Sequence, residues 1–292
     1  MGKVYEYEPG HWRIENPKTG SQAEFLPMRG GICTGFKALD QEIFYLDEAT
    51  LKDPKVNIRG GNPILFPICG NLQADRYQVG ETTYTLSRHG FARSKAWSVV
   101  DIDEGESPSI TLELKADAET LASYPFQFRL AFTYRLAGNQ LQILQRYENH
   151  GENPMPFSAG FHPYFAIKDK NSLEIMIPAQ TYRDHVTGAT GNFSEGQFSF
   201  AEPVIDWIFT DVHDQEAYLV RPKVGVVISL TYDPVFKYLV FWTLKDKGFC
   251  CLEPWMGPRN SLNTGDGVQV LAPATSLETQ FSIGVQALNR KG

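Results

Sequence analysis

The sequence predicts an all-β protein built as a large antiparallel β-sandwich. Several segments alternate apolar and polar residues at a period of two, turn-forming stretches separate them, and no segment shows the spacing of an amphipathic helix. The chain has 292 residues, of which 42% are hydrophobic and 13% aromatic, so it can bury a substantial core. Sandwiches of this length commonly remain one domain, so residues 1–292 are expected to form a single domain.

The clearest strand patterns lie in the first half of the chain. Residues 110–114 alternate between apolar and polar side chains, and residues 126–136 place their apolar side chains on one face and mostly polar side chains on the other. Gly138 and Asn139 then favour a turn into residues 141–147. Residues 126–136 and 141–147 are therefore predicted to form a β-hairpin.

The second half of the chain supplies the remaining strand signals. Residues 226–232 and 238–244 are more continuously apolar, as strands in the middle of a sheet often are. Residues 277–285 return to alternation and place Phe281 and Ile283 on one face. We expect all three segments to be strands of the same sandwich.

The charge distribution excludes some classes of partner. The formal net charge is -7, and lysine and arginine are scattered through the sequence. Nucleic acids and anionic membranes are bound by a concentrated basic face, so neither is expected as a partner, and a small neutral or locally clamped ligand fits better. The start of the chain lacks a secretory signal and the apolar runs are too short to span a bilayer, so a soluble cytoplasmic protein is expected.

The four cysteines are Cys33, Cys69, Cys250 and Cys251. They form no C-x-x-C pair and have no metal-ligand spacing to histidine, so no metal site is expected. A cytosolic protein keeps its thiols reduced, and free cysteine behaves as a small hydrophobic residue. The sequence therefore predicts buried thiols within strands.

Two ionisable residues stand among aromatic and apolar neighbours. His162 lies between Phe161 and Pro163, where a strand is expected to end, and Glu253 lies between Leu252 and Pro254. Burial raises the pKa of a carboxyl group and lowers that of an imidazole, which brings both toward the range where proton transfer is efficient. The two residues are candidates for a general acid and a general base. The alternatives are a structural histidine and a glutamate that binds a buried backbone amide.

Two arginines are candidates for anion binding. Arg59 precedes a glycine turn that opens onto an apolar segment, and Arg93 ends the segment that begins at His89. Two guanidinium groups that converge on one site would bind a phosphate or carboxylate through paired hydrogen bonds. The alternative is two unrelated surface ion pairs.

Five short segments follow one another along the chain. They are Arg59-Gly-Gly-Asn-Pro-Ile-Leu-Phe-Pro67, His89-Gly-Phe-Ala-Arg93, Gly160-Phe-His-Pro-Tyr-Phe165, Val204-Ile-Asp-Trp-Ile-Phe209 and Cys251-Leu-Glu-Pro-Trp255. In this combination and order they resemble the aldose 1-epimerase superfamily, which includes the galactose mutarotases. The first two segments look closer to the glucose-6-phosphate 1-epimerase branch.

The resemblance implies a galactose mutarotase-like sandwich and a reaction that needs no metal or organic cofactor. It implies that Glu253 takes the proton from the anomeric hydroxyl while His162 protonates the ring oxygen, so that the sugar ring opens to the aldehyde. Rotation next to the carbonyl followed by reclosure gives the opposite anomer. His89 and Asp206 would hold sugar hydroxyls, and His89 would also polarise the ring oxygen.

Aromatic residues near these motifs are candidate walls and platforms of the site. Phe161, Tyr164 and Phe165 are expected to surround His162. Phe161, Tyr164 and Trp255 are candidates to contact the apolar face of a sugar.

The substrate stays open between a sugar phosphate and a free aldose. Arg59 and Arg93 match the phosphate-specific branch, whereas residues 71–77 lack the aromatic-rich stretch associated with hexose-phosphate epimerases. The main alternative function is a non-catalytic carbohydrate-binding or regulatory protein, but a pure binder would not need both His162 and Glu253. A glycoside hydrolase or lyase on a related sandwich usually needs two carboxylates or a differently placed base pair, and Asp206 is the only partner to suggest for Glu253.

Overall fold

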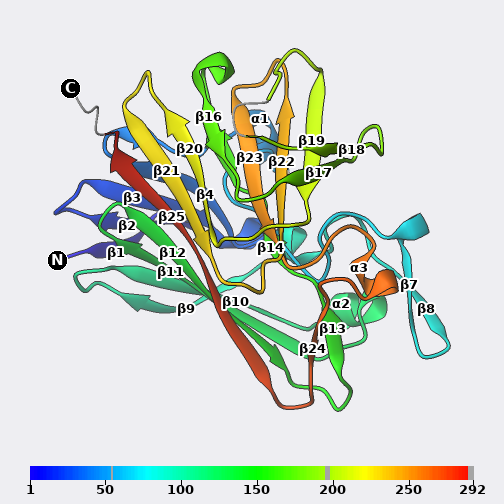
Figure 1. Ribbon diagram of the computed structural model, residues 1–292. Helices are drawn as coiled ribbons and strands as arrows, with labels where there is room; N and C mark the ends of the chain where they lie inside the picture. The colour runs from blue at the N-terminus through cyan, green and yellow to red at the C-terminus, as the bar shows by residue number, and fades with distance from the viewer. Residues whose placement is uncertain (54, 195–197, 289–292) are drawn as a thin grey trace.

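A computed structural model describes residues 1–53, 55–194 and 198–288 of the chain. Two large sheets, each with eight strands, pack together with a five-stranded sheet (Figure 1). The named strands of these sheets pair in antiparallel fashion throughout, and helices are few and short. The prediction of an all-β antiparallel sandwich is confirmed.

The first eight-stranded sheet contains most of the segments predicted as strands. In sheet order its strands are β16 (Glu174–Met176), β20 (Glu216–Arg221), β21 (Val226–Tyr232), β25 (Ser276–Ala287), β12 (Gln140–Asn149), β11 (Phe128–Ala137), β10 (Ser109–Lys115) and β9 (Ser98–Asp103). The predicted hairpin is formed by β11 and β12, which pair from Phe128 with Asn149 to Ala137 with Gln140. β11 begins at Phe128 rather than at residue 126, because the Phe126 N–H bonds to the Tyr124 carbonyl in a turn.

The second eight-stranded sheet carries the candidate site. In sheet order its strands are β18 (Thr190–Asn192), β17 (Thr181–Asp184), β19 (Val204–Phe209), β22 (Tyr238–Leu244), β23 (Phe249–Trp255), β14 (Gly160–Phe161) and β6 (Ile64–Leu65), while β15 (Tyr164–Ala166) also pairs with β23. The segment predicted as a strand at residues 238–244 is β22 and lies in the middle of this sheet. β23 is buried at every position, which indicates that both faces of this part of the sheet are covered.

Smaller elements complete the fold. The five-stranded sheet contains β1 (Lys3–Glu8), β2 (His11–Asn16), β3 (Ser21–Leu26), β4 (Ile32–Ala38) and β5 (Gln41–Glu42), and the separate pairs are β7 (Arg76–Val79) with β8 (Thr82–Thr85) and β13 (Met155–Phe157) with β24 (Gln269–Leu271). The helices are α1 (Glu48–Lys52), α2 (Ala118–Ser123) and α3 (Ser261–Thr264), with 3-10 turns η1 (Pro27–Arg29), η2 (Gln73–Asp75), η3 (Ala92–Ser94) and η4 (Lys170–Ser172). Among the described residues, no helix is long and apolar enough to cross a membrane.

One large hydrophobic core fills the space between the sheets. Its members extend from Val4 near the start of the chain to Val285 in β25. Phe66 is fully buried in it and meets the rings of Phe91, Tyr124, Phe128, Tyr147 and Phe157. Because both ends of the chain contribute to this cluster, we propose that residues 1–292 fold as one domain.

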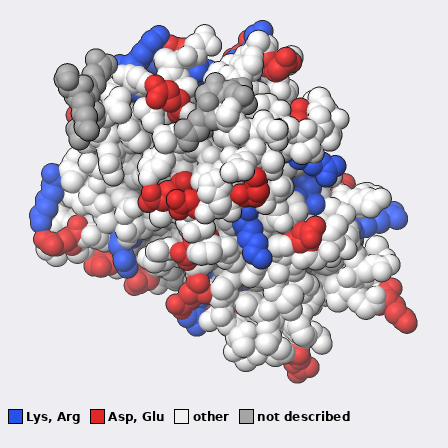
Figure 2. All heavy atoms as spheres, in the orientation of Figure 1, with Lys and Arg blue, Asp and Glu red and all other residues white. Residues whose placement is uncertain are grey.

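The cysteines are all free and buried, as predicted. Cys33 lies in β4, and Cys250 and Cys251 lie in β23, whereas Cys69 follows β6 outside any strand. On the face of the molecule shown in Figure 2, acidic and basic side chains are interspersed rather than gathered into one basic surface.

Candidate active site

The candidate site lies on the face of the second sheet that points away from the main core. Successive residues of a strand point to opposite faces, so β23 divides its side chains between the two sides. Cys250 and Leu252 belong to the main core. Cys251 and Trp255 belong to two separate small apolar clusters. Glu253 shares their parity along β23 and therefore points to the same side.

Strand register brings His162 opposite Glu253. His162 and Pro163 separate β14 from β15, and both of these short strands pair with β23. The Cα partners on either side are Gly160 with Trp255 and Tyr164 with Cys251. Continuing this register places His162 across from Glu253, and the His162 Nε2 atom lies 3.3 Å from Glu253 Oε1. Residues about ninety positions apart in the sequence are thus direct neighbours.

Gly160 permits this close approach of β14 to β23. A Cβ atom at position 160 would lie 2.8 Å from Cys69 Sγ and 2.8 Å from the Pro254 carbonyl oxygen. Side-chain carbons do not approach backbone atoms so closely, so any other residue would push β14 away from β23. The glycine before Phe161 and His162 is therefore part of what holds the histidine in place.

Burial shifts the pKa values of the pair in opposite directions. Desolvation raises the pKa of Glu253 well above its usual range. Desolvation lowers the pKa of His162 to about 3, and the charges of Arg93 and Arg88 contribute to the same direction. The Trp255 indole N–H donates to Glu253 Oε2 at 3.1 Å and favours the ionised carboxylate. Burial therefore favours a protonated Glu253 and a neutral His162, so the proton of the pair lies on the carboxyl group.

His89 is fixed as a hydrogen-bond donor beside the pair. Its backbone has φ +68°, a left-handed conformation that is uncommon for a residue other than glycine. The Gly70 N–H donates to His89 Nδ1 at 3.0 Å, so the neutral ring carries its proton on Nε2. Burial lowers the pKa of His89 well below its usual value, which keeps the ring neutral. Its ring centroid lies 5.6 Å from that of His162 and 5.7 Å from that of Trp255.

Asp206 is held by two residues that the sequence did not indicate. It lies in β19, and its two oxygens contact His185 Nδ1 at 2.9 Å and the Arg259 guanidinium at 2.7 Å. Burial acts to raise the pKa of Asp206, but the hydrogen bond from His185 and the charge of Arg259 outweigh it, so the pKa is below its usual value. A cavity of about 640 Å³ lies beside this group and is lined by His185, Arg259 and Tyr238 among others. No motif in the sequence singles out His185 or Arg259.

The arginines predicted to bind an anion lie at different depths. Arg59 is exposed and Arg93 is half-buried. Both charges act on the Tyr164 phenol in the direction that lowers its pKa, although burial raises that pKa overall. Within the described residues neither guanidinium forms an ion pair with a carboxylate, so the alternative of two surface ion pairs is not observed. Arg88 adds a third positive charge that acts on both His162 and Glu253.

The predicted aromatic walls are partly wrong. Phe161 and Phe165 belong to the main core, and Phe161 packs against Phe281 there. They point away from the site because their parity along the chain is opposite to that of Tyr164. Tyr164 stacks on His162 with centroids 4.8 Å apart.

Trp242 is an aromatic wall that the sequence reasoning missed. This half-buried side chain on β22 meets the His162 ring edge-on at 5.6 Å. Its Cα partners are Cys251 on one side and Asp206 on the other, so it bridges the two parts of the site. Trp242 lies in a continuously apolar strand, and such a pattern does not show which residues face a ligand, so the sequence did not indicate its role.

Three metal-ligating side chains also meet here. One ligand atom each from His162, Cys251 and Glu253 lies within 4.8 Å of the others, and all three residues are buried. No spacing in the sequence indicates this grouping, because it depends on the pairing of β15 and β23.

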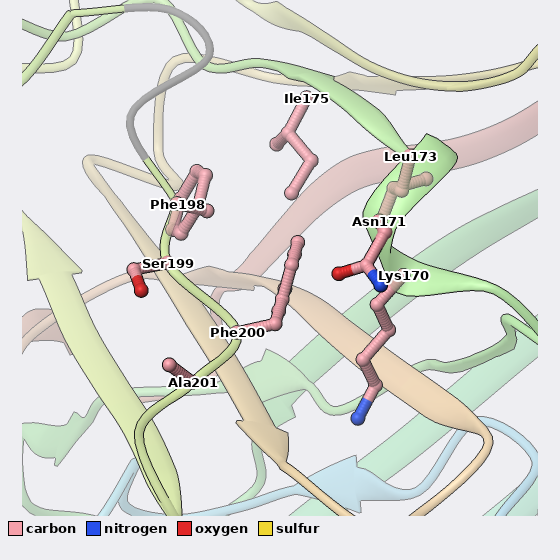
Figure 3. Close-up of a pocket in the computed structure, with 8 residues that line it drawn as sticks. All are labelled: Lys170, Asn171, Leu173, Ile175, Phe198, Ser199, Phe200 and Ala201. Carbon is pink, nitrogen blue, oxygen red and sulfur yellow. The ribbon is translucent and has the colours of Figure 1, made fainter.

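A different pocket lies between η4 and the segment that precedes β19 (Figure 3). Phe198, Phe200 and Ile175 line its apolar part. The Lys170 ammonium group bonds to the backbone carbonyls of Leu244 and Lys245, so it is engaged structurally. This pocket shares no lining residue with the group around His162.

The chain is similar to several known proteins in sequence and in overall structure. The Slr1438 protein from Synechocystis sp. PCC 6803 has a solved structure that superposes with a TM-score of 0.93, at 35% identity over 99% of this chain and 97% of that one. The plasmid-encoded protein LacX of Lactococcus lactis subsp. lactis is 27% identical over 81% of this chain and 85% of its own length. A Cenchrus ciliaris protein, provisionally named a glucose-6-phosphate 1-epimerase, is 26% identical over 77% of this chain and 72% of its own.

Most of the chain also matches a known protein family. Residues 13–284 match the family described as aldose 1-epimerase, and this range contains all of the site residues discussed above. The chain therefore belongs to the aldose 1-epimerase family.

Proposed function

We propose that this protein interconverts the α and β anomers of an aldohexose or a hexose 6-phosphate by acid–base ring opening and reclosure. Family membership supports a sugar epimerase role in general. The observation that carries the specific proposal is the 3.3 Å contact between His162 Nε2 and Glu253 Oε1 in a buried site. Such a pair can exchange protons with two oxygen atoms that are attached to the same carbon.

The chemical step requires Glu253 ionised and His162 protonated. Glu253 accepts the proton of the anomeric hydroxyl, the electrons of that O–H bond form the carbonyl, and the bond from the anomeric carbon to the ring oxygen breaks. His162 donates its proton to the departing ring oxygen. After rotation, reclosure on the other face of the carbonyl returns both protons, so the pair ends with the proton count it began with.

Some of the charges around the pair favour this distribution of protons and others oppose it. The positive charges of Arg88 and Arg259 favour an ionised Glu253. The negative charge of Asp206 favours a protonated His162. These effects oppose burial, whereas the positive charges of Arg93 and Arg88 lower the pKa of His162 and the negative charge of Asp206 raises the pKa of Glu253, in the same directions as burial.

The remaining groups position the sugar. His89 presents an Nε2–H donor, which suits the ring oxygen or an adjacent hydroxyl. Asp206 is an acceptor held in place by His185 and Arg259. Trp242 and Tyr164 offer flat apolar surfaces next to His162, which suit the C–H face of a sugar ring.

Asp206→Asn should weaken substrate binding more than it slows the chemical step. A hydrogen bond to a charged group contributes about 1.5–3 kcal/mol, so KM is expected to rise by roughly 10- to 100-fold while kcat changes less. Steady-state anomer exchange measures both constants. Asp233→Asn is the matched control, because Asp233 bonds to Thr279 and Gln280 away from the candidate site residues. A loss confined to kcat would instead place Asp206 in the chemical step.

A phosphorylated substrate is supported by the positive charges at the site. Arg59, Arg88 and Arg93 supply cations near Tyr164 and the acid–base pair, and Arg93 lacks a carboxylate partner among the described residues. The name of the Cenchrus ciliaris relative points in the same direction. A free aldohexose is the competing substrate, since Asp206 and His89 can bind hydroxyls without a phosphate.

Arg93→Gln separates these substrates. If Arg93 contacts a phosphate, KM for glucose 6-phosphate should rise by about 10-fold or more, whereas KM for glucose should change by less than about twofold. Parallel kinetics with both sugars, repeated at raised salt, measure the difference. Equal effects on the two sugars would show that Arg93 does not recognise the phosphate.

The experiment that tests the proposed function is exchange NMR of anomer interconversion with glucose, galactose and glucose 6-phosphate. Acceleration of at least one of the three above the spontaneous rate is the expected result. If a sugar binds by calorimetry and its exchange is not accelerated, the protein is a sugar-binding protein rather than an epimerase for that ligand.

A further inference from the structure

The grouping of His162, Cys251 and Glu253 matches the ligand set of a transition-metal ion. Zinc is bound in proteins by imidazole nitrogen, thiolate sulfur and carboxylate oxygen, commonly with three protein ligands and one open position. Here one atom from each residue lies within 4.8 Å of the other two. All three come from positions fixed by the pairing of β14 and β15 with β23.

An ion could bind here with little movement of the three ligand atoms. Two ligands at about 2.0–2.1 Å from zinc in tetrahedral geometry are about 3.3 Å apart. The His162 Nε2 to Glu253 Oε1 distance is 3.3 Å. The thiolate would lie about 3.5 Å from each of them, and the Cys251 sulfur is now within 4.8 Å of both, so a side-chain rotation that moves it by at most about 1 Å is enough.

We propose that His162, Cys251 and Glu253 form a binding site for a divalent transition-metal ion such as Zn²⁺, and that the bound ion blocks the acid–base pair. Binding displaces the thiol proton of Cys251 and any proton on Glu253 into solvent. The ion then occupies the lone pairs of His162 and Glu253 that proton transfer would use. The binding part stands on geometry alone, and the inhibitory part rests on the proposed function.

The charges around the site determine whether a cation is attracted or repelled. Thiolate and carboxylate together supply two negative charges, and Asp206 adds another nearby. Arg88 and Arg259 oppose the cation, since their charges reach Glu253. The thiolate and the carboxylate would contact the ion directly, whereas the arginines act from a distance. The attraction by the two anionic ligands is therefore stronger than the repulsion by the arginines. Magnesium and calcium are not expected to bind, because they prefer oxygen ligands to sulfur.

The two adjacent cysteines provide a matched pair of variants. Cys251 faces the site, whereas Cys250 faces the main core and is equally buried. Co²⁺ serves as a spectroscopic probe of the site. When it is added to the wild type and to Cys250→Ser, it should produce a thiolate-to-cobalt absorption band in the near ultraviolet. Cys251→Ser should lack the band, and its affinity for Zn²⁺ in competition should be at least about 100-fold lower. Cys251→Ala repeats the test without a hydroxyl group.

Anomer exchange gives the second readout. Zn²⁺ should inhibit the wild type and Cys250→Ser and leave Cys251→Ser active at the same concentration. An absorption band that persists in both Cys251 variants, or no band in the wild type, would overturn the metal site. A band that depends on Cys251 in a protein without exchange activity would retain the metal site and refute the proposed function. Activation by Zn²⁺ would overturn the inhibitory role.

Discussion

Glu253→Gln is expected to reduce anomer exchange by about 1000-fold, the range that a positioned general base contributes. Glutamine has nearly the same shape, and its carbonyl oxygen can still accept the Trp255 N–H bond. It cannot accept the proton of the anomeric hydroxyl. Exchange NMR should show the fall in kcat, and calorimetry should show that sugar binding changes little.

Stability separates a catalytic role of Glu253 from a structural one. Burial raises the pKa of Glu253, so the folded protein holds this proton more tightly than the unfolded chain does. The stability contributed by the protonated carboxyl is therefore present below the unfolded pKa of about 4.3 and is lost as the pH rises toward the folded pKa. The amide does not ionise, so the variant should be at least as stable at neutral pH.

Glu148→Gln is the matched control for Glu253→Gln. Glu148 is also buried, but it binds Arg129, Arg146 and His150 away from the candidate site residues. Burial opposes its ionisation, yet these partners outweigh burial and lower its pKa to about 2. The control should therefore lose stability and keep its exchange activity. Full activity in Glu253→Gln would remove Glu253 from the mechanism.

His162→Gln is expected to slow exchange by about 100- to 10,000-fold, because it removes the group that protonates the ring oxygen. The glutamine amide reaches a similar position and can donate a hydrogen bond to the ring oxygen, but it cannot give up a proton. The loss should therefore appear in kcat, with KM changed less. Steady-state and single-turnover exchange with the preferred sugar measure this division.

A second histidine serves as the control. His150 contacts Glu148 and is exposed, so His150→Gln should leave exchange unchanged. A sugar whose ring oxygen departs as a weaker base needs less help from a general acid. Its anomer exchange should therefore be slowed less by His162→Gln than by Glu253→Gln. Equal losses with such a substrate would argue that His162 only positions Glu253.

Much of the fold could be read from the sequence because strand alternation reports burial directly. In β11, Phe128, Leu130 and Phe132 recur at every second position and are buried, as the pattern requires of a half-buried strand. The short strands β14 and β15 carry no such period, since each is only two or three residues long. Their pairing with β23 was not predictable from local pattern, because it is a contact between distant segments.

The candidate site was predicted in part. The apolar surroundings of His162 and Glu253 indicated perturbed pKa values, and burial produces those shifts in the structure. The contact between them came from resemblance to a family. Phe161 was assigned to the wrong side, and Trp242 was missed, because an aromatic residue can serve the core or the site equally well.

The sequence by itself determined the all-β class, the main strands, the buried thiols and the residue types able to exchange protons. These properties follow from local composition and from a period of two, which a single segment can display. Tertiary structure decided which side chains share one face of the second sheet. The registers of β14 and β15 against β23 set Glu253 3.3 Å from His162 and placed Cys251 beside both, while Cys250 turned to the core. Register is a property of paired segments, so neither segment encodes it alone.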